Sequence, residues 1–178
     1  MNSENALRFV RLTADYSLKS FDCGDDDLND FLLSDAKPFL AQLLTVTYLL
    51  ENDTDTTAFY SLQNDRVSFQ DFKDDKTSWN RFNRRIPNVK RLRSYPAVKL
   101  GRLAVNSGYQ SGGYGTIILD TIKELFVRNN RTGCKFLTVD AYSQALRFYE
   151  RNGFSYLTTQ DEGQQTRLMY FDLGTLSS

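Results

Sequence analysis

The chain has 178 residues, 40% of them hydrophobic, with 22 basic and 22 acidic side chains and no histidine. This length suits one domain with its own core, which we expect to span residues 1–178. The absence of histidine excludes Ser-His-Asp and Cys-His catalytic machinery, and with only two cysteines no metal site is expected.

The N-terminus and the hydropathy of the chain predict a cytoplasmic protein without a membrane anchor. No window approaches the roughly 18 consecutive apolar residues of a membrane helix. The opening "MNSENALRFV" lacks a basic stretch followed by an apolar one, as a secretion signal would have. Cys23 and Cys134 lie far apart in the sequence, and in a reducing compartment we expect both to be free thiols.

Charge is distributed unevenly along the chain. Residues 1–75 carry six basic and fifteen acidic side chains, residues 76–94 carry seven basic and no acidic ones, and the remainder carries nine and seven. The basic stretch "KTSWNRFNRRIPNVKRLRS" includes Trp79 and Phe82 and could hold a phosphate-bearing partner. The interpretation we favour is a solvated connector that offsets the acidic N-terminal third.

The first half of the chain predicts a strand, a helical region and a hairpin. Residues 7–13 alternate apolar and polar side chains, as in a half-buried strand. Apolar residues then recur at helical steps from Leu28 to Leu44, after three aspartates, and Pro38 should kink or split this helix. The runs "TVTYLLEN" and "TTAFYSLQ" flank "DTD" and predict a hairpin. Residues 65–75 are expected to form a short helix.

The second half predicts strand-turn-helix units. A strand over residues 97–105 precedes a glycine-rich turn, and a helix follows from about Thr116 to Asn130. Its apolar stripe comprises Ile117, Ile118, Ile122, Leu125 and Phe126. "CKFLTVDAY" is a further strand, and Ser143 is the expected N-cap of the helix "QALRFYERN", which Gly153 ends. "FSYLTT" and "TRLMYFDL" close the chain as a hairpin around "QDEGQQ". This order predicts an α/β protein with a mixed sheet.

The glycine-rich turn joins a predicted strand to a predicted helix. Glycines there let a ligand approach the unpaired N–H groups of the first helical turn, which favours a phosphate. No lysine follows Gly113 or Gly115, so a P-loop is excluded, and the third small residue of a dinucleotide fingerprint would fall at Ile118. The alternative is that these glycines only permit tight packing.

Two motifs give the chain a specific resemblance. Residues 110–115, "QSGGYG", fit the Q/R-x-x-G-x-G/A motif of the GNAT superfamily of acyl-CoA N-acyltransferases, and residues 145–154, "ALRFYERNGF", resemble its A-x-x-F-Y-x-x-x-G-F helix. The resemblance extends from about Leu7 to Leu173. It implies an α+β mixed sheet of about seven strands flanked by helices. The segments "SFDCG", "LNDFL", "AFYSL" and "LGRLAV" are also similar to the branch that contains toxins acetylating aminoacyl-tRNA.

The resemblance implies a binding site for acetyl-CoA as cosubstrate. Backbone N–H groups from Gly112 to Thr116 would hold the pyrophosphate, and the pantetheine arm would run beside the end of the preceding strand. Gln110 is assigned to the turn and its phosphate. The implied cofactor-binding residues are Leu103, Ala104, Val105, Gln110, Ser111, Gly112, Gly113, Tyr114, Gly115 and Thr116.

Tyr149 is the candidate general acid, because a phenol can protonate the departing thiolate. The alternative is a core aromatic, but we expect Phe148 to fill that role. No acidic residue lies on the strand "AVKLGRLAV". The general base that deprotonates the amine could therefore be water, Glu51 or an N-terminal aspartate, and an amine of naturally low pKa would need no base. Lys99 and Arg102 could bind an anionic substrate or form ion pairs. Acylation of Cys23 is disfavoured for want of an activating neighbour.

The resemblance predicts an N-acetyltransferase that transfers an acetyl group from acetyl-CoA to a primary amine by direct attack. One alternative is a toxin that acetylates aminoacyl-tRNA, which the acidic N-terminal third disfavours because it would repel nucleic acid. Another is a non-catalytic acyl-CoA-binding module. The amine acceptor is unknown, and residues 23–39 with the "QDEGQQ" loop are expected to shape its site. A homodimer is left open.

Overall fold

The computed structural model describes residues 6–73, 75–87 and 92–176. Their seven strands form one mixed sheet in the order β1-β2-β3-β4-β5-β7-β6, with helices beside it, which confirms the predicted fold class. The strands are β1 (Arg8–Arg11), β2 (Val46–Glu51), β3 (Thr56–Ser68), β4 (Ser94–Val105), β5 (Phe136–Tyr142), β6 (Ser155–Tyr156) and β7 (Thr166–Asp172). The α-helices are α1 (Asp26–Asp30), α2 (Ala36–Ala41), α3 (Lys76–Arg84), α4 (Tyr114–Arg128) and α5 (Leu146–Arg151).

Contacts divide the chain into two compact units. The first comprises residues 1–63 and 100–121, and the second comprises residues 64–99 and 122–178. Strands β3 and β4 and helix α4 contribute residues to both. The expectation of a single domain over residues 1–178 stays a prediction. No helix among the described residues combines the length and the apolar character needed to cross a membrane.

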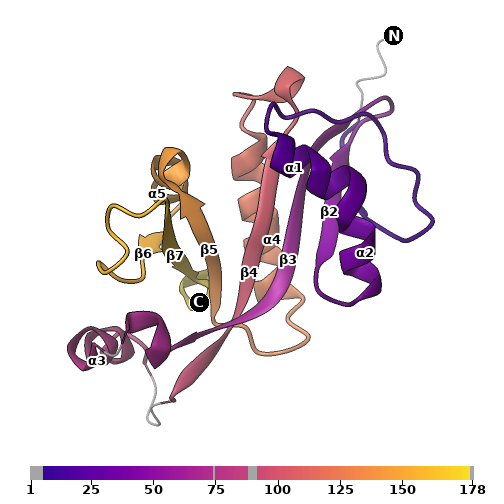
Figure 1. Ribbon diagram of the computed structural model, residues 1–178. Helices are drawn as coiled ribbons and strands as arrows, with labels where there is room; N and C mark the ends of the chain where they lie inside the picture. The colour runs from indigo at the N-terminus through magenta and orange to yellow at the C-terminus, as the bar shows by residue number, and fades with distance from the viewer. Residues whose placement is uncertain (1–5, 74, 88–91, 177–178) are drawn as a thin grey trace. The chain divides into compact units, whose positions relative to one another are not determined.

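In the first unit, an antiparallel sheet carries a helical segment on one face. β1 pairs with β2 and β2 pairs with β3, as the predicted hairpin requires. Figure 1 shows α1 and α2 lying in front of β2 and β3. Apolar side chains recur at every second residue of the strands and at every third or fourth residue of the helices. Each element therefore has one apolar face, and these faces meet in a core beneath the helices. It contains Leu12, Phe21, Phe31, Leu32, Ala36, Leu49, Phe59 and Ala104.

The helical region changes its bonding pattern before Pro38, whereas Pro38 itself, where a kink or split was expected, lies within α2. Asp25 caps α1 by accepting a hydrogen bond from Leu28 N–H at 3.0 Å. A π-helical turn at Phe31–Asp35 then separates α1 from α2, and Ala36 N–H donates to Phe31 C=O. Pro38 supplies no N–H for the helical ladder, so a change in the bonding pattern just before it costs less than it would elsewhere.

The second unit is built on β5 and a cluster of aromatic side chains. β4 pairs with β5 in parallel, from Ala97–Phe136 to Lys99–Thr138. β7 runs antiparallel to β5 along its whole length and also pairs with β6, as the predicted C-terminal hairpin requires. The core comprises Val67, Phe72, Trp79, Phe82, Ile86, Tyr95, Ala97, Phe136 and Leu157.

Two predictions between residues 65 and 94 are wrong. Strand β3 continues to Ser68, and only a 3-10 turn follows at Phe69–Phe72 instead of a helix over residues 65–75. The basic stretch is no solvated connector: it forms α3, whose Trp79 and Phe82 are 8% and 6% exposed. The apolar rings face the aromatic core and the charged residues face solvent. Positions 88–91 of this stretch lie outside the described residues.

The helices on either side of β5 differ from their predictions in detail. α4 begins at Tyr114, and its buried stripe includes Leu119 in place of Ile117, which is 46% exposed. Ser143 does not cap α5: its hydroxyl bonds the carbonyl of Gln165 at 3.2 Å, and a 3-10 turn at Ser143–Ala145 precedes the helix. Gly153 ends α5 as predicted, with φ at +84°.

Candidate functional site

The turn after β4 holds the start of α4 in a fixed place. Asn106 N–H donates to Thr57 C=O at 2.9 Å, and the Asn106 side chain donates to Thr56 C=O at 3.2 Å. A 3-10 turn at Ser107–Tyr109 follows. The Tyr109 hydroxyl bonds Asn52 at 2.8 Å and Asp55 at 3.0 Å, on the turn between β2 and β3.

Each of the first two glycines in the turn has a distinct physical role. A Cβ atom on Gly112 would lie 2.7 Å from the Tyr114 ring and 3.2 Å from Tyr109 C=O, so any other residue there would require the ring to move. Gly113 has φ at +81° with open space around it, so its role is conformational. Ser111 is also left-handed, with φ at 65°. The backbone therefore reverses sharply just before the helix.

The first turn of α4 offers N–H groups to a ligand. The first intrahelical hydrogen bond runs from Ile117 N–H to Gly113 C=O at 3.2 Å. The N–H groups of Tyr114, Gly115 and Thr116 therefore have no acceptor within the helix. Together with the positive end of the helix dipole, they form an arrangement suited to an anion such as a pyrophosphate.

Gln110 is exposed, but its side chain bonds two backbone carbonyls of the protein. Its amide nitrogen donates to Cys23 C=O at 3.0 Å and to Val105 C=O at 3.1 Å. The side chain therefore links the turn to β4 and to the loop before α1. This contact is the functional feature that sequence reasoning missed, since no local pattern connects residues 23 and 110.

The strand residues assigned to the pantetheine arm belong to the end of β4. Ala104 is buried in the core of the first unit, whereas Leu103 and Val105 are half-buried. The structure brings these residues and the turn from Gln110 to Thr116 together in the first unit. Their role as a coenzyme site stays a prediction.

Tyr149 belongs to the second unit and is fixed by the end of α5. Phe154 N–H donates to Tyr149 C=O and Gly153 N–H donates to Glu150 C=O, both at 3.0 Å, which is a Schellman motif. The apolar contact typical of this motif joins the Tyr149 and Phe154 rings, whose centroids are 5.3 Å apart. The spacing of "FYERNGF" therefore determines how Tyr149 packs.

The expectation that Phe148 would fill the core in place of Tyr149 is wrong. Tyr149 is buried, with 7% of its surface exposed, and Phe148 is half-buried. Burial raises the pKa of Tyr149 well above the ordinary value of 10.0 for tyrosine. Within the described chain no residue forms a hydrogen bond with its hydroxyl. The phenol therefore keeps its proton and leaves it available for donation.

Glu51 is engaged within the protein rather than available as a base. It is 0% exposed, and its carboxylate accepts hydrogen bonds from the Tyr16 hydroxyl at 2.5 Å and from Thr56 at 3.2 Å. Lys19 lies 3.3 Å from the same carboxylate. The hydrogen bond to Glu51 raises the pKa of Tyr16.

The other residues considered for substrate binding or catalysis, Lys99, Arg102 and Cys23, have different surroundings. Lys99 pairs with Asp140 within the sheet, whereas Arg102 is exposed, lies 5.0 Å from the Phe31 ring centroid, and has no ion-pair partner among the described residues. Burial raises the pKa of the Cys23 thiol, which contacts Asn29, so it remains protonated as expected. In the described ranges no three His, Cys, Asp or Glu residues could together hold a metal ion.

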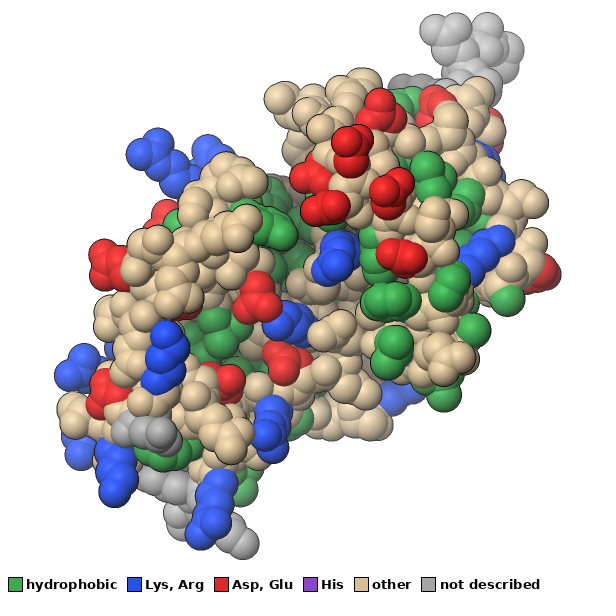
Figure 2. Space-filling model, in the orientation of Figure 1, with side chains coloured by type: hydrophobic (Ala, Val, Ile, Leu, Met, Phe, Trp, Pro, Cys, Tyr) green, Lys and Arg blue, Asp and Glu red, His purple; other side chains and the backbone are tan. Residues whose placement is uncertain are grey.

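Charge separates by unit. Residues of the first unit include five basic and twelve acidic side chains, a balance of −7, and those of the second include seventeen and ten, a balance of +7. In Figure 2, acidic side chains gather over α1 and the segment after it. Basic side chains gather over α3 and its C-cap, and the exposed ones are Lys76, Arg81, Arg84 and Arg85. None of these four forms an ion pair with another described residue.

Comparisons with known proteins agree with this architecture. Residues 81–156 match the family described as the acetyltransferase (GNAT) domain. No curated protein matches the chain. Three similar solved structures are a bacterial toxin (TM-score 0.78, 16% identity, 97% of this chain and 93% of that chain), AtaT complexed with acetyl-methionyl-tRNAfMet (0.76, 24%, 96% and 97%) and AtaTR bound with acetyl-CoA (0.71, 24%, 96% and 95%). These similarities confirm the predicted fold.

Proposed function

We propose that this chain is a GNAT acetyltransferase that transfers an acetyl group from acetyl-CoA to a primary amine. Its fold and the match of residues 81–156 support the proposal. The observation that carries the proposal is the turn before α4. Gly113 is left-handed there, Gly112 lies close to the Tyr114 ring, and the N–H groups of the first helical turn have no acceptor in the helix; this arrangement suits a pyrophosphate. The solved structure of AtaTR, which has a similar fold, is bound with acetyl-CoA.

In the proposed reaction the neutral amine attacks the thioester carbonyl carbon. A C–N bond forms as the C–S bond breaks, and a backbone N–H of β4 stabilises the oxyanion. The Tyr149 phenol gives its proton to the departing thiolate, and the amine loses a proton to solvent. The raised pKa of Tyr149 keeps this acid protonated until the thiolate forms.

The engagement of Glu51 supports an acceptor that needs little help from a base. Its carboxylate is buried and already bound by Tyr16, Thr56 and Lys19, so it has no free face for an incoming amine. An amine that is partly neutral near physiological pH fits this chemistry. The α-amino group of an aminoacyl ester is one such amine.

Calorimetry with coenzyme A tests the donor site. Gly113→Asp adds a carboxylate and removes glycine at a left-handed position, so we expect coenzyme A binding to be lost. Gly163→Asp is the matched control, because Gly163 also has a positive φ of 78° and open space around it. Equal affinity in both variants would contradict the site. Release of thiol from acetyl-CoA with an amine separates an enzyme from a non-catalytic acyl-CoA-binding module.

Charge separation favours aminoacyl-tRNA as the acceptor. The objection to this acceptor was the acidic N-terminal third, but those residues lie mostly in the first unit, whereas the exposed cations of α3 lie in the second. Such cations can hold phosphates while the acidic surface belongs to another part of the fold. AtaT, which shares the fold, is found in complex with acetyl-methionyl-tRNAfMet.

An acceptor panel tests this second proposal. Thiol release is compared with charged tRNA, the free amino acid, small primary amines and a lysine peptide. We expect charged tRNA to be acetylated at the lowest concentration, because its phosphates add binding energy that a free amino acid lacks. If a small amine is acetylated as efficiently as charged tRNA, the tRNA assignment is refuted and the protein is a general N-acetyltransferase.

A further inference from the structure

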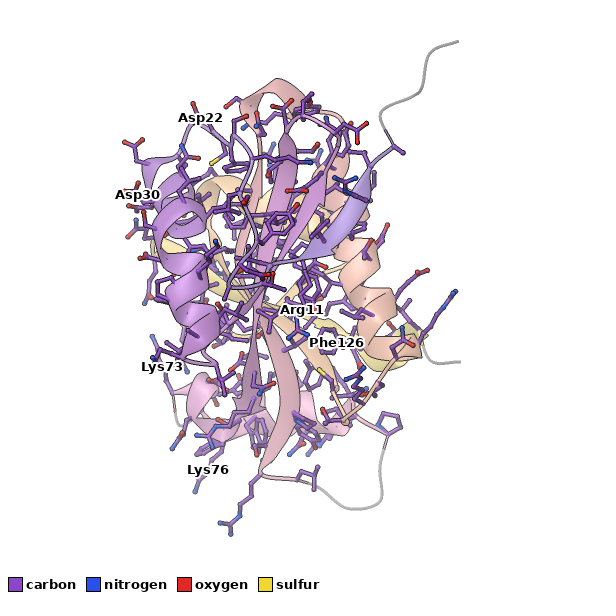
Figure 3. The ribbon with its side chains drawn as sticks, turned by 90° about the vertical axis from the view of Figure 1, so that its right-hand side faces the viewer. Arg11, Asp22, Asp30, Lys73, Lys76 and Phe126 are labelled. Atoms are coloured by element: carbon purple, nitrogen blue, oxygen red, sulfur yellow. The ribbon has the colours of Figure 1, made fainter. Side chains whose placement is uncertain are left out.

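The loop before α1 is bonded directly to the turn after β4. Ser107 N–H donates to Asp22 C=O at 2.8 Å, and the Gln110 amide donates to Cys23 C=O at 3.0 Å. In Figure 3, Asp22 lies near the turn that follows β4, at one end of the helical segment that contains Asp30. Two segments about 85 residues apart in sequence thus meet at the start of the candidate phosphate site.

The orientation of the Gln110 amide follows from its partners. Both groups that it meets, Cys23 C=O and Val105 C=O, can only accept hydrogen bonds. The NH2 end must therefore face them, and its two protons are both used. The exposed Gln110 side chain thus links two backbone segments, and its amide donors are not left for a ligand.

The loop that Gln110 contacts is stiff and leads into α1. The Asp22 carboxylate accepts hydrogen bonds from Gly24 N–H and from Asn29, both at 2.8 Å. Asn29 in turn accepts from Cys23 N–H at 3.0 Å. These hydrogen bonds join residues 22–24 to Asn29 in α1. A restraint on the backbone at Cys23 therefore also restrains the start of α1.

The turn has a second attachment that does not involve Gln110. The Tyr109 hydroxyl bonds Asn52 and Asp55, and Asn106 bonds the backbone of β3. A variant that lacks the Gln110 donors therefore keeps the turn attached to β2 and β3. Only the side-chain link to segment 22–29 is removed, so the effect of Gln110 can be isolated.

We propose that Gln110 is a positioning residue that couples the phosphate-binding turn to segment 22–29, so that coenzyme binding stiffens the start of α1. The coupling rests on the proposed acetyl-CoA site. A ligand that orders the turn lowers the entropy cost of ordering whatever is bonded to it. Residues 23–39 are expected to shape the acceptor site, so the coupling would prepare that region when the donor is bound.

Hydrogen exchange with coenzyme A as the probe tests the coupling. In the wild type we expect coenzyme A to slow exchange in peptides covering residues 110–118 and also in those covering 22–29. Gln110→Met keeps the side-chain length but removes both donors. It should retain protection at 110–118 and show weaker protection at 22–29, where the bond from Ser107 to Asp22 remains. It should bind coenzyme A about fivefold to tenfold more weakly, as expected for two modest hydrogen bonds.

Two further variants define the result. Gln110→Arg restores N–H donors, so protection at 22–29 should return. Gln144→Met makes the same substitution at an exposed glutamine of the second unit and should behave as wild type. Unchanged protection at 22–29 in Gln110→Met would overturn the coupling. If coenzyme A protects only residues 110–118 in the wild type, the coupling is refuted but the acetyl-CoA site stands. If coenzyme A does not bind at all, the acetyl-CoA site itself is refuted.

Discussion

Tyr149 combines the packing of a core residue with a hydroxyl that no described residue binds. Its ring lies between Phe148 and Phe154, with centroid distances of 5.1 and 5.3 Å. The side chain is 7% exposed, and its hydroxyl is not among the fully buried polar atoms without a partner, so a group that approaches the end of the ring can reach it. The proposed acid role needs this hydroxyl, and burial, which raises the pKa of Tyr149, keeps the phenol protonated at neutral pH.

Replacing Tyr149 by phenylalanine separates chemistry from packing. We expect kcat to fall about a hundredfold, as for the loss of a general acid, with coenzyme A affinity and thermal stability unchanged. Steady-state kinetics and calorimetry measure the split. Tyr60→Phe is the control, since Tyr60 is also buried and also has a raised pKa. Equal rates for wild type and Tyr149→Phe would remove the acid role.

Buried tyrosines also predict how stability depends on pH. Burial raises the pKa values of Tyr149 and Tyr60 above 10.0, whereas both groups ionise near that value in the unfolded chain. The folded state then holds more protons, so stability is complete below about pH 10 and falls as the pH rises further. Urea unfolding at about pH 8 and about pH 11 should show this loss. It should be smaller in Tyr60→Phe, and an equal loss would contradict the assignment.

Two helices end in the same motif with different residues at the left-handed position. In α5 this residue is Gly153, and in α2 it is Leu43, whose φ is 57° and whose side chain is 90% exposed. Leu44 N–H donates to Phe39 C=O and Leu43 N–H donates to Leu40 C=O, which completes the motif in α2. Leucine in this conformation is strained, and its exposed side chain gains nothing from packing.

Leu43→Gly should therefore raise the free energy of unfolding by about 0.5–1 kcal/mol, the relief of strain less the added entropy of the unfolded chain. Urea unfolding monitored by circular dichroism measures the change. Leu44→Gly is the control: Leu44 is exposed as well but is not left-handed, so no gain is expected. A gain of the same size at Leu44 would show that strain is not the cause.

At the scale of elements, sequence reasoning located most strands but missed α3. The signal was present, because Trp79, Phe82 and Ile86 follow helical spacing and all three are buried. Dense arginines and lysines hid it, since the same residues are typical of a solvated loop. The end of β3 was missed for another reason: residues 64–66 are polar and read as a break, although the strand continues to Ser68.

At the scale of the whole molecule, the separation of charge predicts a salt effect. Changing Lys76, Arg81 and Arg84 of α3 to glutamine should raise KM for charged tRNA and reduce the salt slope of binding by about one for each phosphate that is no longer neutralised. KM for acetyl-CoA should not change. Arg11→Gln with Lys37→Gln, in the first unit, is the control. An unchanged salt slope in the α3 variant would mean that this helix does not hold the nucleic acid.

The sequence by itself determined the order of most strands and helices, the glycine turn and the pairing of that turn with the motif that contains Tyr149. These features are local, because periodicity, left-handed glycines and fixed spacings act over a few residues. The tertiary structure alone decided that Gln110 bonds Cys23, that Tyr149 rather than Phe148 is buried, that Glu51 is engaged, and that opposite charges fall into different units. Each of these depends on contacts between distant segments, which only the folded chain brings together.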